Sequence, residues 1–115
     1  TAEIYRQVEK IDEVIESLVI GQNWKNDTRL ILFVVLRENI QLSRELIKII
    51  KDQLRTGASP RHVPSIVIQT PEIPKTKSGK IVELAVRDLV NGKEIKNASA
   101  LANPESSDFY RNLKI

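Results

Sequence analysis

The stretch Thr70–Lys80 reads Thr-Pro-Glu-Ile-Pro-Lys-Thr-Lys-Ser-Gly-Lys, and the rest of the chain is organised around it. Its two prolines restrict the backbone before three lysines follow one another closely. Ser78-Gly79 predicts a tight turn just before Lys80. Apolar sequence resumes at Ile81, directly after that lysine. This framing indicates a shaped loop that delivers one ammonium group to a fixed point, which a solvated run of charge does not need.

Two explanations of the stretch can be compared from the residues alone. A phosphate-binding P-loop requires Gly-x(4)-Gly-Lys-Ser/Thr. Here Pro74 occupies the position of the first glycine and Ile81 follows Lys80, so this explanation fails twice. A basic patch for nucleic acid or nuclear import accounts for the lysines, but it does not account for the prolines or Gly79.

The segment Pro74–Lys80 resembles the last core motif of the acyl-adenylate-forming enzymes, whose pattern is Pro-x(4)-Gly-Lys. That superfamily contains acyl-CoA synthetases, luciferases and the adenylation domains of peptide synthetases. The resemblance implies a two-step reaction in which an acid first reacts with ATP, and coenzyme A then displaces AMP. It also implies that Lys80 is the catalytic lysine of the first step, with Ser78 and Gly79 shaping the loop around the nucleotide.

Composition limits the other classes of function. The chain has 115 residues, is 41% hydrophobic and 29% charged, and contains no cysteine. These values predict one soluble domain without disulfides or thiolate metal sites. We expect a cytosolic location, because neither a signal peptide nor an apolar run of membrane-spanning length is visible. We therefore expect no membrane partner.

Charge is distributed unevenly along the chain. Residues 41–80 carry a net charge of +5, whereas residues 1–40 carry −2. The positive middle suits a polyphosphate such as ATP or coenzyme A, and it equally suits nucleic acid. However, no aromatic residue lies in the basic region, so base stacking has no platform there. A free-standing basic interaction or nucleic-acid module thus remains the alternative of another class, and we expect no nucleic-acid partner.

The periodicity of apolar residues predicts the elements. Ile4, Val8 and Ile11 lie on one side of a first helix. The seven-residue apolar run Leu30–Leu36 indicates a strand buried on both faces, able to pair with Leu18–Gln22 as a hairpin across a polar turn over residues 21–28. The remaining predictions are a helix from Ser43 to Arg55 with Gly57 at its C′ position, an extended link over residues 60–64, a strand over residues 65–69, a helix over residues 82–90 ended by Gly92, a polar tail over residues 92–102, and a helix from Pro104 to about residue 113.

This order predicts an α+β domain with a small three-stranded sheet and flanking helices. The C-terminal lid domain of acyl-CoA synthetases has the same size and order. The resemblance therefore implies that residues 1–115 form one lid domain of a larger synthetase, whose large N-terminal domain and hinge precede Thr1. The N-terminal domain of the same enzyme is then the expected partner, together with small-molecule substrates.

Further stretches resemble the acetoacetyl-CoA synthetase branch of this superfamily. They are Ser59–Pro64, Leu101–Glu105, Ala2–Tyr5 and Ile31–Phe33. The tail is similar to the acetyl- and propionyl-CoA synthetases as well, and these remain the main alternative. The branch implies ATP, Mg²⁺ and coenzyme A as cofactors of the full-length enzyme. The isolated domain is expected to bind none of them and to be inactive, because the acid and adenine pockets lie on the other domain.

Arg55 and His62 are further candidates for the site. Arg55 lies nine residues before Pro64. In acetyl-CoA synthetase-like sequences, an arginine at this spacing contacts a phosphate of coenzyme A. An exposed arginine favoured by the helix dipole explains Arg55 equally well. His62 is the only histidine, and packing or a hydrogen bond suits it better than catalysis. Because it has no partner histidine or cysteine, we expect no metal site. Lys75 and Lys77 are expected to be solvated.

Overall fold

A computed structural model describes residues 2–78, 82–94 and 101–113 of the chain. Its elements follow the order helix, two strands, helix, strand and two helices, which confirms the predicted α+β class. No helix within the described residues is long and apolar enough to cross a membrane.

The sheet has three strands in the order β1-β2-β3. Strands β1 (Val14–Trp24) and β2 (Asp27–Leu36) form an antiparallel hairpin, and β3 (Ile66–Gln69) pairs with β2 in parallel. The hairpin is confirmed, but the polar turn expected over residues 21–28 is much shorter. Only Lys25 and Asn26 lie between the strands, with φ of 47° and 64°. Two consecutive positive φ angles are typical of the two-residue turns that match the twist of paired strands.

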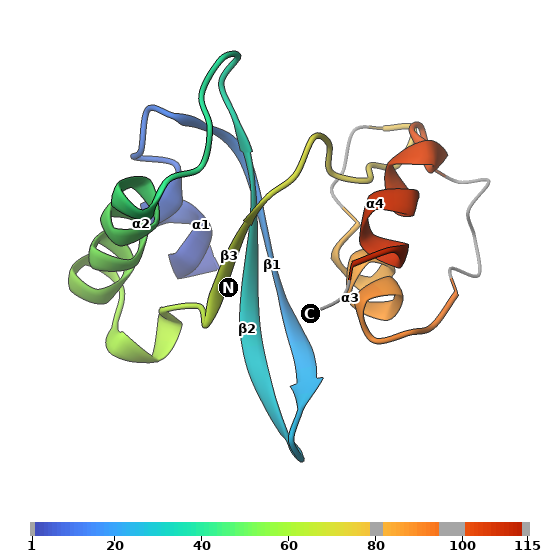
Figure 1. Ribbon diagram of the computed structural model, residues 1–115, viewed down its shortest axis with the longest axis horizontal. Coiled ribbons are helices and arrows are strands. Elements are labelled where there is room, and N and C mark those ends of the chain that lie inside the picture. The colour runs from blue at the N-terminus through green and yellow to red at the C-terminus, as the bar shows by residue number, and fades with distance from the viewer. Residues whose placement is uncertain (1, 79–81, 95–100, 114–115) are drawn as a thin grey trace.

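Strand β2 is buried on both faces, as its unbroken apolar sequence predicted. Leu32, Val34 and Leu36 contribute to one hydrophobic core, and Ile31 and Phe33 contribute to the other. Each core is covered by its own helices, so β2 is the central strand of a three-layer arrangement (Figure 1).

An irregularity in β1 alters which residues face each core. The register of the hairpin shifts between Val14 and Glu16. Such a bulge inserts one residue and reverses the alternation beyond it. Val14 therefore reaches the same core as Val19, five residues away, while Leu18 and Ile20 face the opposite core. As a result, Glu16 lies outside both apolar clusters.

Helices α1 (Ala2–Val8) and α2 (Arg44–Gly57) cover one face of the sheet. The predicted cap is confirmed, because the backbone N–H of Leu46 donates to Ser43 Oγ at 3.1 Å. The assignment of Gly57 to the C′ position is wrong, since Gly57 is the last helical residue and Ala58 is the cap. Gly57 is required for close packing instead: a Cβ there would lie 2.2 Å from Gln7 Oε1.

The link between the two prolines is a single 3-10 turn (Pro60–His62), not an extended segment. Ser59 and Val63, the residues that precede the prolines, are indeed extended. Between them Pro60 has the φ that a helical first position needs, and the N–H of His62 donates to the carbonyl of Ser59 at 3.0 Å.

The other face of the sheet is covered by α3 (Glu83–Val90) and α4 (Ser107–Arg111), as Figure 1 shows. The predicted helix over residues 82–90 is confirmed, with Val82 as its N-cap, and Gly92 follows it with φ of 83°. The predicted helix from Pro104 divides into a 3-10 turn (Pro104–Ser106) and α4. The middle of the polar tail, residues 95–100, lies outside the described residues, while Leu101 is buried.

Candidate functional site

The predicted catalytic loop is described up to Ser78. Gly79 and Lys80 lie outside the described residues, so the structure does not test their predicted roles. Ser78 is exposed, and its hydroxyl lies 2.9 Å from the hydroxyl of Thr76. The described parts of the chain on either side of Lys80 show how the base of the loop is built.

The base of this loop is closed by backbone hydrogen bonds. Val82 N–H donates to the carbonyl of Pro74 at 3.2 Å, which joins the chain before the loop to the chain after it. Ala102 N–H donates to the carbonyl of Lys75 at 2.8 Å, and Thr76 forms an antiparallel bridge with Leu101. The end of the polar tail therefore pairs with the start of the lysine loop.

Asn103 continues this contact with its side chain. Its Oδ1 accepts from the N–H of Lys75 at 2.9 Å, and its Nδ2 donates to the carbonyl of Ile73 at 3.0 Å and to Glu72 Oε1 at 2.7 Å. A backbone N–H can only donate and a carbonyl can only accept, so these partners fix the orientation of the amide. The sequence placed Asn103 in the stretch Leu101–Glu105 that carries part of the family resemblance and directly before a helix start, and neither pattern predicts these contacts.

Tyr110 contacts the chain just before the lysine loop, at Thr70 and Glu72. Its hydroxyl donates to the carbonyl of Glu72 at 2.8 Å and lies 3.0 Å from the hydroxyl of Thr70. Both side chains are almost fully buried, and the ring of Tyr110 packs edge-on against Phe33 at 5.0 Å. Burial raises the pKa of Tyr110 to about 12, partly opposed by the hydrogen bond with Thr70.

The expectation that Lys75 is solvated is wrong. Its ammonium lies 2.5 Å from Glu16 on β1, and about a third of each side chain is exposed. The bulge in β1 allows this pairing, because it places Glu16 on the side of the sheet that carries the loop. Lys75 thus anchors the loop to the sheet, whereas Lys77 is exposed, as expected, with no ion pair among the described residues.

Arg55 lies in the last turn of α2, where it pairs with Asp52 at 2.9 Å and is half-exposed. This helix packs on the face of the sheet opposite the lysine loop (Figure 1). Arg55 belongs to a series spaced i, i+4, i+7 and i+11, which places its members on one side of a helix. We call this series the α2 basic stripe; it consists of Arg44, Lys48, Lys51 and Arg55.

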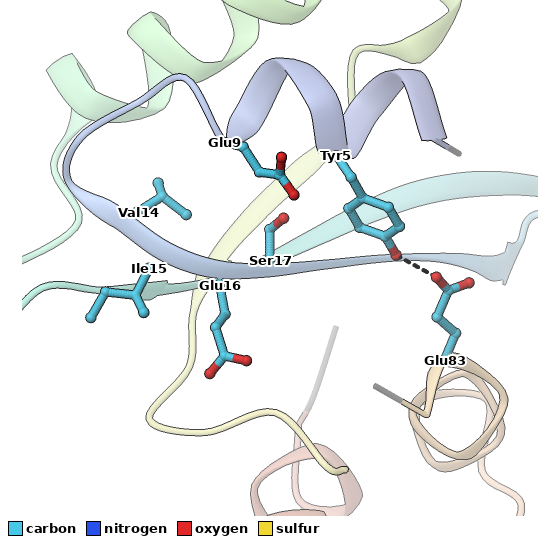
Figure 2. A pocket seen from close by; sticks show the side chains of 7 residues that line it. All are labelled: Tyr5, Glu9, Val14, Ile15, Glu16, Ser17 and Glu83. Carbon is cyan, nitrogen blue, oxygen red and sulfur yellow. Dashed lines mark hydrogen bonds between the residues drawn. The ribbon is translucent and has the colours of Figure 1, made fainter. Parts of the chain in front are cut away.

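A cavity of about 320 Å³ lies beside the outer edge of β1. Figure 2 shows Tyr5 from α1 reaching past this strand to Glu83, which begins α3. The Tyr5 hydroxyl donates to Glu83 at 2.7 Å and accepts from the N–H of Val19 at 3.1 Å. Burial, with the neighbouring Glu83, raises the pKa of Tyr5 well above its usual value. This contact joins the two layers of helices.

The contact of His62 agrees with the expectation that it takes part in a hydrogen bond. The Nδ1 atom of His62 lies 2.7 Å from Ser59 Oγ, which is the hydrogen-bonded role favoured by the sequence. Within residues 2–78, 82–94 and 101–113, no group of three or more histidine, cysteine, aspartate or glutamate residues is arranged to hold a metal ion.

The described residues form a small α+β domain in which hydrogen bonds anchor the base of the lysine loop, and comparison with known proteins identifies its family. Residues 3–80 match the family described as the AMP-binding enzyme C-terminal domain. The chain belongs to this family. Its last third, including Asn103 and Tyr110, lies beyond the matched residues.

Individual relatives narrow the resemblance to one branch. The chain is 56% identical to the acetoacetyl-coenzyme A synthetase of Rhizobium meliloti and 45% identical to the acetoacetyl-CoA synthetase of Xenopus tropicalis, with 99% and 98% of the chain covered. It also superposes on the structure of acetoacetyl-CoA synthetase from Streptomyces lividans, with a TM-score of 0.87, 38% identity and 96% of the chain covered. The chain spans 18%, 17% and 17% of the length of these three proteins.

Proposed function

We propose that this chain is the mobile C-terminal lid of an ATP-dependent acid–CoA ligase that converts acetoacetate, ATP and coenzyme A to acetoacetyl-CoA, AMP and pyrophosphate. The observation that supports it most is the 56% identity to an acetoacetyl-CoA synthetase across 99% of the chain. The large domain that binds the acid and the adenine belongs to the remainder of the enzyme.

In the first step, a carboxylate oxygen of the acid attacks the α-phosphate of ATP, and the bond to pyrophosphate breaks. Negative charge accumulates between the carboxylate and the phosphate. The ammonium of Lys80 stabilises this charge, since a preorganised cation acts most strongly where charge develops. The ion pair of Lys75 with Glu16 and the closed loop base support the role, because they anchor the segment that carries Lys80.

In the second step, the sulfur of coenzyme A attacks the acyl carbonyl, and the bond to AMP breaks. We propose that the lid rotates between the steps, and that Arg55 then faces a phosphate of coenzyme A. The placement of α2 and the lysine loop on opposite faces of the sheet supports this division, because one rotation exchanges the face presented to the active site. Mg²⁺ would accompany the phosphates of ATP.

The test uses Lys80→Ala in the full-length enzyme and follows the two half-reactions separately. Pyrophosphate release should fall by about 100- to 1000-fold, the usual cost of removing a preorganised stabilising group. Thioester formation from supplied acetoacetyl-AMP should stay close to normal. Arg55→Ala should show the reverse pattern. Equal loss of both half-reactions in Lys80→Ala would refute the assignment, and similar weak effects of Lys75→Ala, Lys77→Ala and Lys80→Ala would favour a general basic surface.

Acyl preference requires its own measurement, because the acid pocket lies outside this chain. Acetoacetate, acetate and propionate should be compared by kcat/KM in the full-length enzyme. We expect acetoacetate to give the highest value. A preference for acetate or propionate would move the enzyme to the alternative branch without affecting the roles of Lys80 and Arg55.

A further inference from the structure

The lysine loop has a second support that the family match does not include. The loop leaves the sheet through residues 70–74, and Val82 N–H bonds to the carbonyl of Pro74 where the chain returns. Both backbone polar groups of the next residue, Lys75, are held: its N–H donates to Asn103 Oδ1, and its carbonyl accepts from Ala102 N–H. The contacts with Lys75 and Thr76 come from residues 101–103, in the stretch that follows the polar tail.

The side chain of Asn103 forms its hydrogen bonds with this loop and not with the helical turn that follows it. The residue occupies the N-cap position of the 3-10 turn at Pro104, but its side chain makes no capping bond there. Instead, one amide contacts three residues of the loop base, Glu72, Ile73 and Lys75. The bond to the Glu72 carboxylate is charge-assisted but exposed to water, whereas the bonds to the backbone of Ile73 and Lys75 are partly buried. Three contacts from one planar group fix both the position and the direction of the loop's departure.

We propose that Asn103 is a positioning residue for the adenylation step, acting through the loop that carries Lys80; this rests on the proposed function. Electrostatic stabilisation requires the charged group to be placed within a fraction of an ångström to about 1 Å of its target. The fixed peptide of Lys75 lies five residues before Lys80, so a shift at the base changes where the ammonium is delivered. Asn103 touches no reacting atom and is not itself a catalytic residue.

The experiment compares Asn103→Ala, Asn103→Asp and the matched control Asn112→Ala, an exposed asparagine at the end of α4, in the full-length enzyme. We expect Asn103→Ala to lower the kcat of pyrophosphate release by about 10- to 100-fold, less than loss of the lysine itself. KM for ATP and acetoacetate should change little. Thioester formation from supplied acetoacetyl-AMP should be unchanged, and the control should match the wild type in both assays.

A charge swap gives a second and independent test. Asn103→Asp keeps an acceptor for Lys75 N–H but places a second carboxylate against that of Glu72, so the pair should repel. Adding Glu72→Gln supplies an amide donor to the introduced carboxylate. The double variant should recover at least half, on a logarithmic scale, of the adenylation rate lost in Asn103→Asp. Recovery of this kind is expected of a positioning contact between the two side chains.

Three outcomes would overturn the proposal. They are normal adenylation in Asn103→Ala, equal loss of both half-reactions in that variant, and failure of Glu72→Gln to recover any activity in Asn103→Asp. Lys80→Ala is measured alongside in the same assays. If Lys80→Ala adenylates normally, the proposed function itself fails; if only the Asn103 variants behave like the wild type, the proposed function stands and the positioning role fails.

Discussion

Gly57 shows how one residue can satisfy packing while contradicting local propensity. It ends α2, where its carbonyl accepts from Gln7 Nε2 at 3.1 Å. The same glutamine is almost fully buried and accepts from Gln53 Nε2 at 2.7 Å. Glycine thus leaves room for a buried amide that joins α1 to α2.

We predict that Gly57→Ala destabilises the 115-residue chain by about 1 kcal/mol, despite the better helix propensity of alanine. The propensity gain is at most about 1 kcal/mol. The new Cβ would displace the Gln7 amide, and a buried polar group left unpaired costs about 1–3 kcal/mol. Urea denaturation of both proteins measures the difference.

The control for this prediction is the same substitution in a Gln7→Ala background. There the displaced amide is absent, so Gly57→Ala should be neutral or stabilising. An increase in stability from Gly57→Ala in the wild-type background would contradict the packing argument.

Sequence could predict residues whose role is local, but not those whose partners are distant. Ser43 was recognised as a cap because its partner lies three residues away. Lys75 was expected to be solvated, and the contacts of Asn103 with the loop were not predicted, because Glu16 and Glu72 reach these residues only through the tertiary fold. No local pattern distinguishes an exposed lysine from one that meets a carboxylate 59 positions earlier in the chain. Pro104 follows Asn103 and favours a helix start, and this local pattern gives no indication of the contacts between Asn103 and the loop.

At the level of elements, α2 combines an apolar side that packs on the sheet with the α2 basic stripe on its exposed side. Its buried residues are Leu46, Ile50 and Leu54. Of the four cations, only Arg55 forms an ion pair among the described residues. Sequence located the positive charge in residues 41–80, and the structure resolves part of it into one line along a helix. Such a line raises the local concentration of an anionic ligand.

We predict that Lys48→Glu combined with Lys51→Glu raises the KM for coenzyme A by about 3- to 10-fold at low salt in the full-length enzyme, because the stripe attracts the phosphates. The difference should shrink near 0.5 M salt, where the screening length is only about 4 Å. Pyrophosphate release should not change. Initial rates at several salt concentrations measure both effects.

The matched control reverses a lysine elsewhere on the surface. Lys93 is exposed and follows α3, the helix that covers the opposite face of the sheet. Lys93→Glu alters net charge by two units, as each single substitution in the stripe does, so it is compared with Lys48→Glu and Lys51→Glu made singly; its KM for coenzyme A should stay within about twofold of the wild type. A rise in KM with Lys93→Glu as large as that of each single stripe variant would show that net charge matters and the stripe does not.

The elements themselves were predictable to the extent that their apolar periodicity was long. β2 and α2 were recognised with both their type and their buried positions, whereas β1 was found only over half its length. Outside the apolar centre of this strand, Glu16 and Ser17 beside the bulge and Asn23 near the hairpin tip interrupt the apolar pattern. The 3-10 turn at Pro60 was missed because two prolines favour extended neighbours, whereas Arg61 and His62 do not precede a proline and escape that restriction.

At the scale of the whole molecule, two phenol hydroxyls join segments that are far apart in the sequence, one from the buried Tyr110 and one from the partly buried Tyr5. Tyr5 links α1 to α3 past the edge of β1, and it also satisfies an N–H of that edge strand (Figure 2). Tyr110 links α4 to the base of the lysine loop. Each hydroxyl must be protonated to donate its hydrogen bond, so ionisation would break the contact of Tyr5 between α1 and α3, or the contact of Tyr110 with the base of the lysine loop.

The chain should therefore lose stability at alkaline pH through its tyrosines. It contains two tyrosines, and the pKa of each is raised by burial above the ordinary value of 10.0, that of Tyr110 to about 12. A group with a raised pKa in the folded state contributes stability that is complete below its unfolded pKa and is lost as the pH rises toward its folded pKa. The loss should begin near pH 10 and increase toward pH 12.

We expect tyrosinate absorbance of the 115-residue chain to stay silent through pH 10 and to appear together with the loss of circular dichroism. In urea, the same chain should titrate near its ordinary value. Tyr110→Phe should reduce the pH dependence between 10 and 12, leaving the contribution of Tyr5. Tyrosinate absorbance that develops near pH 10 in a chain still folded by circular dichroism would contradict the role assigned to both phenols.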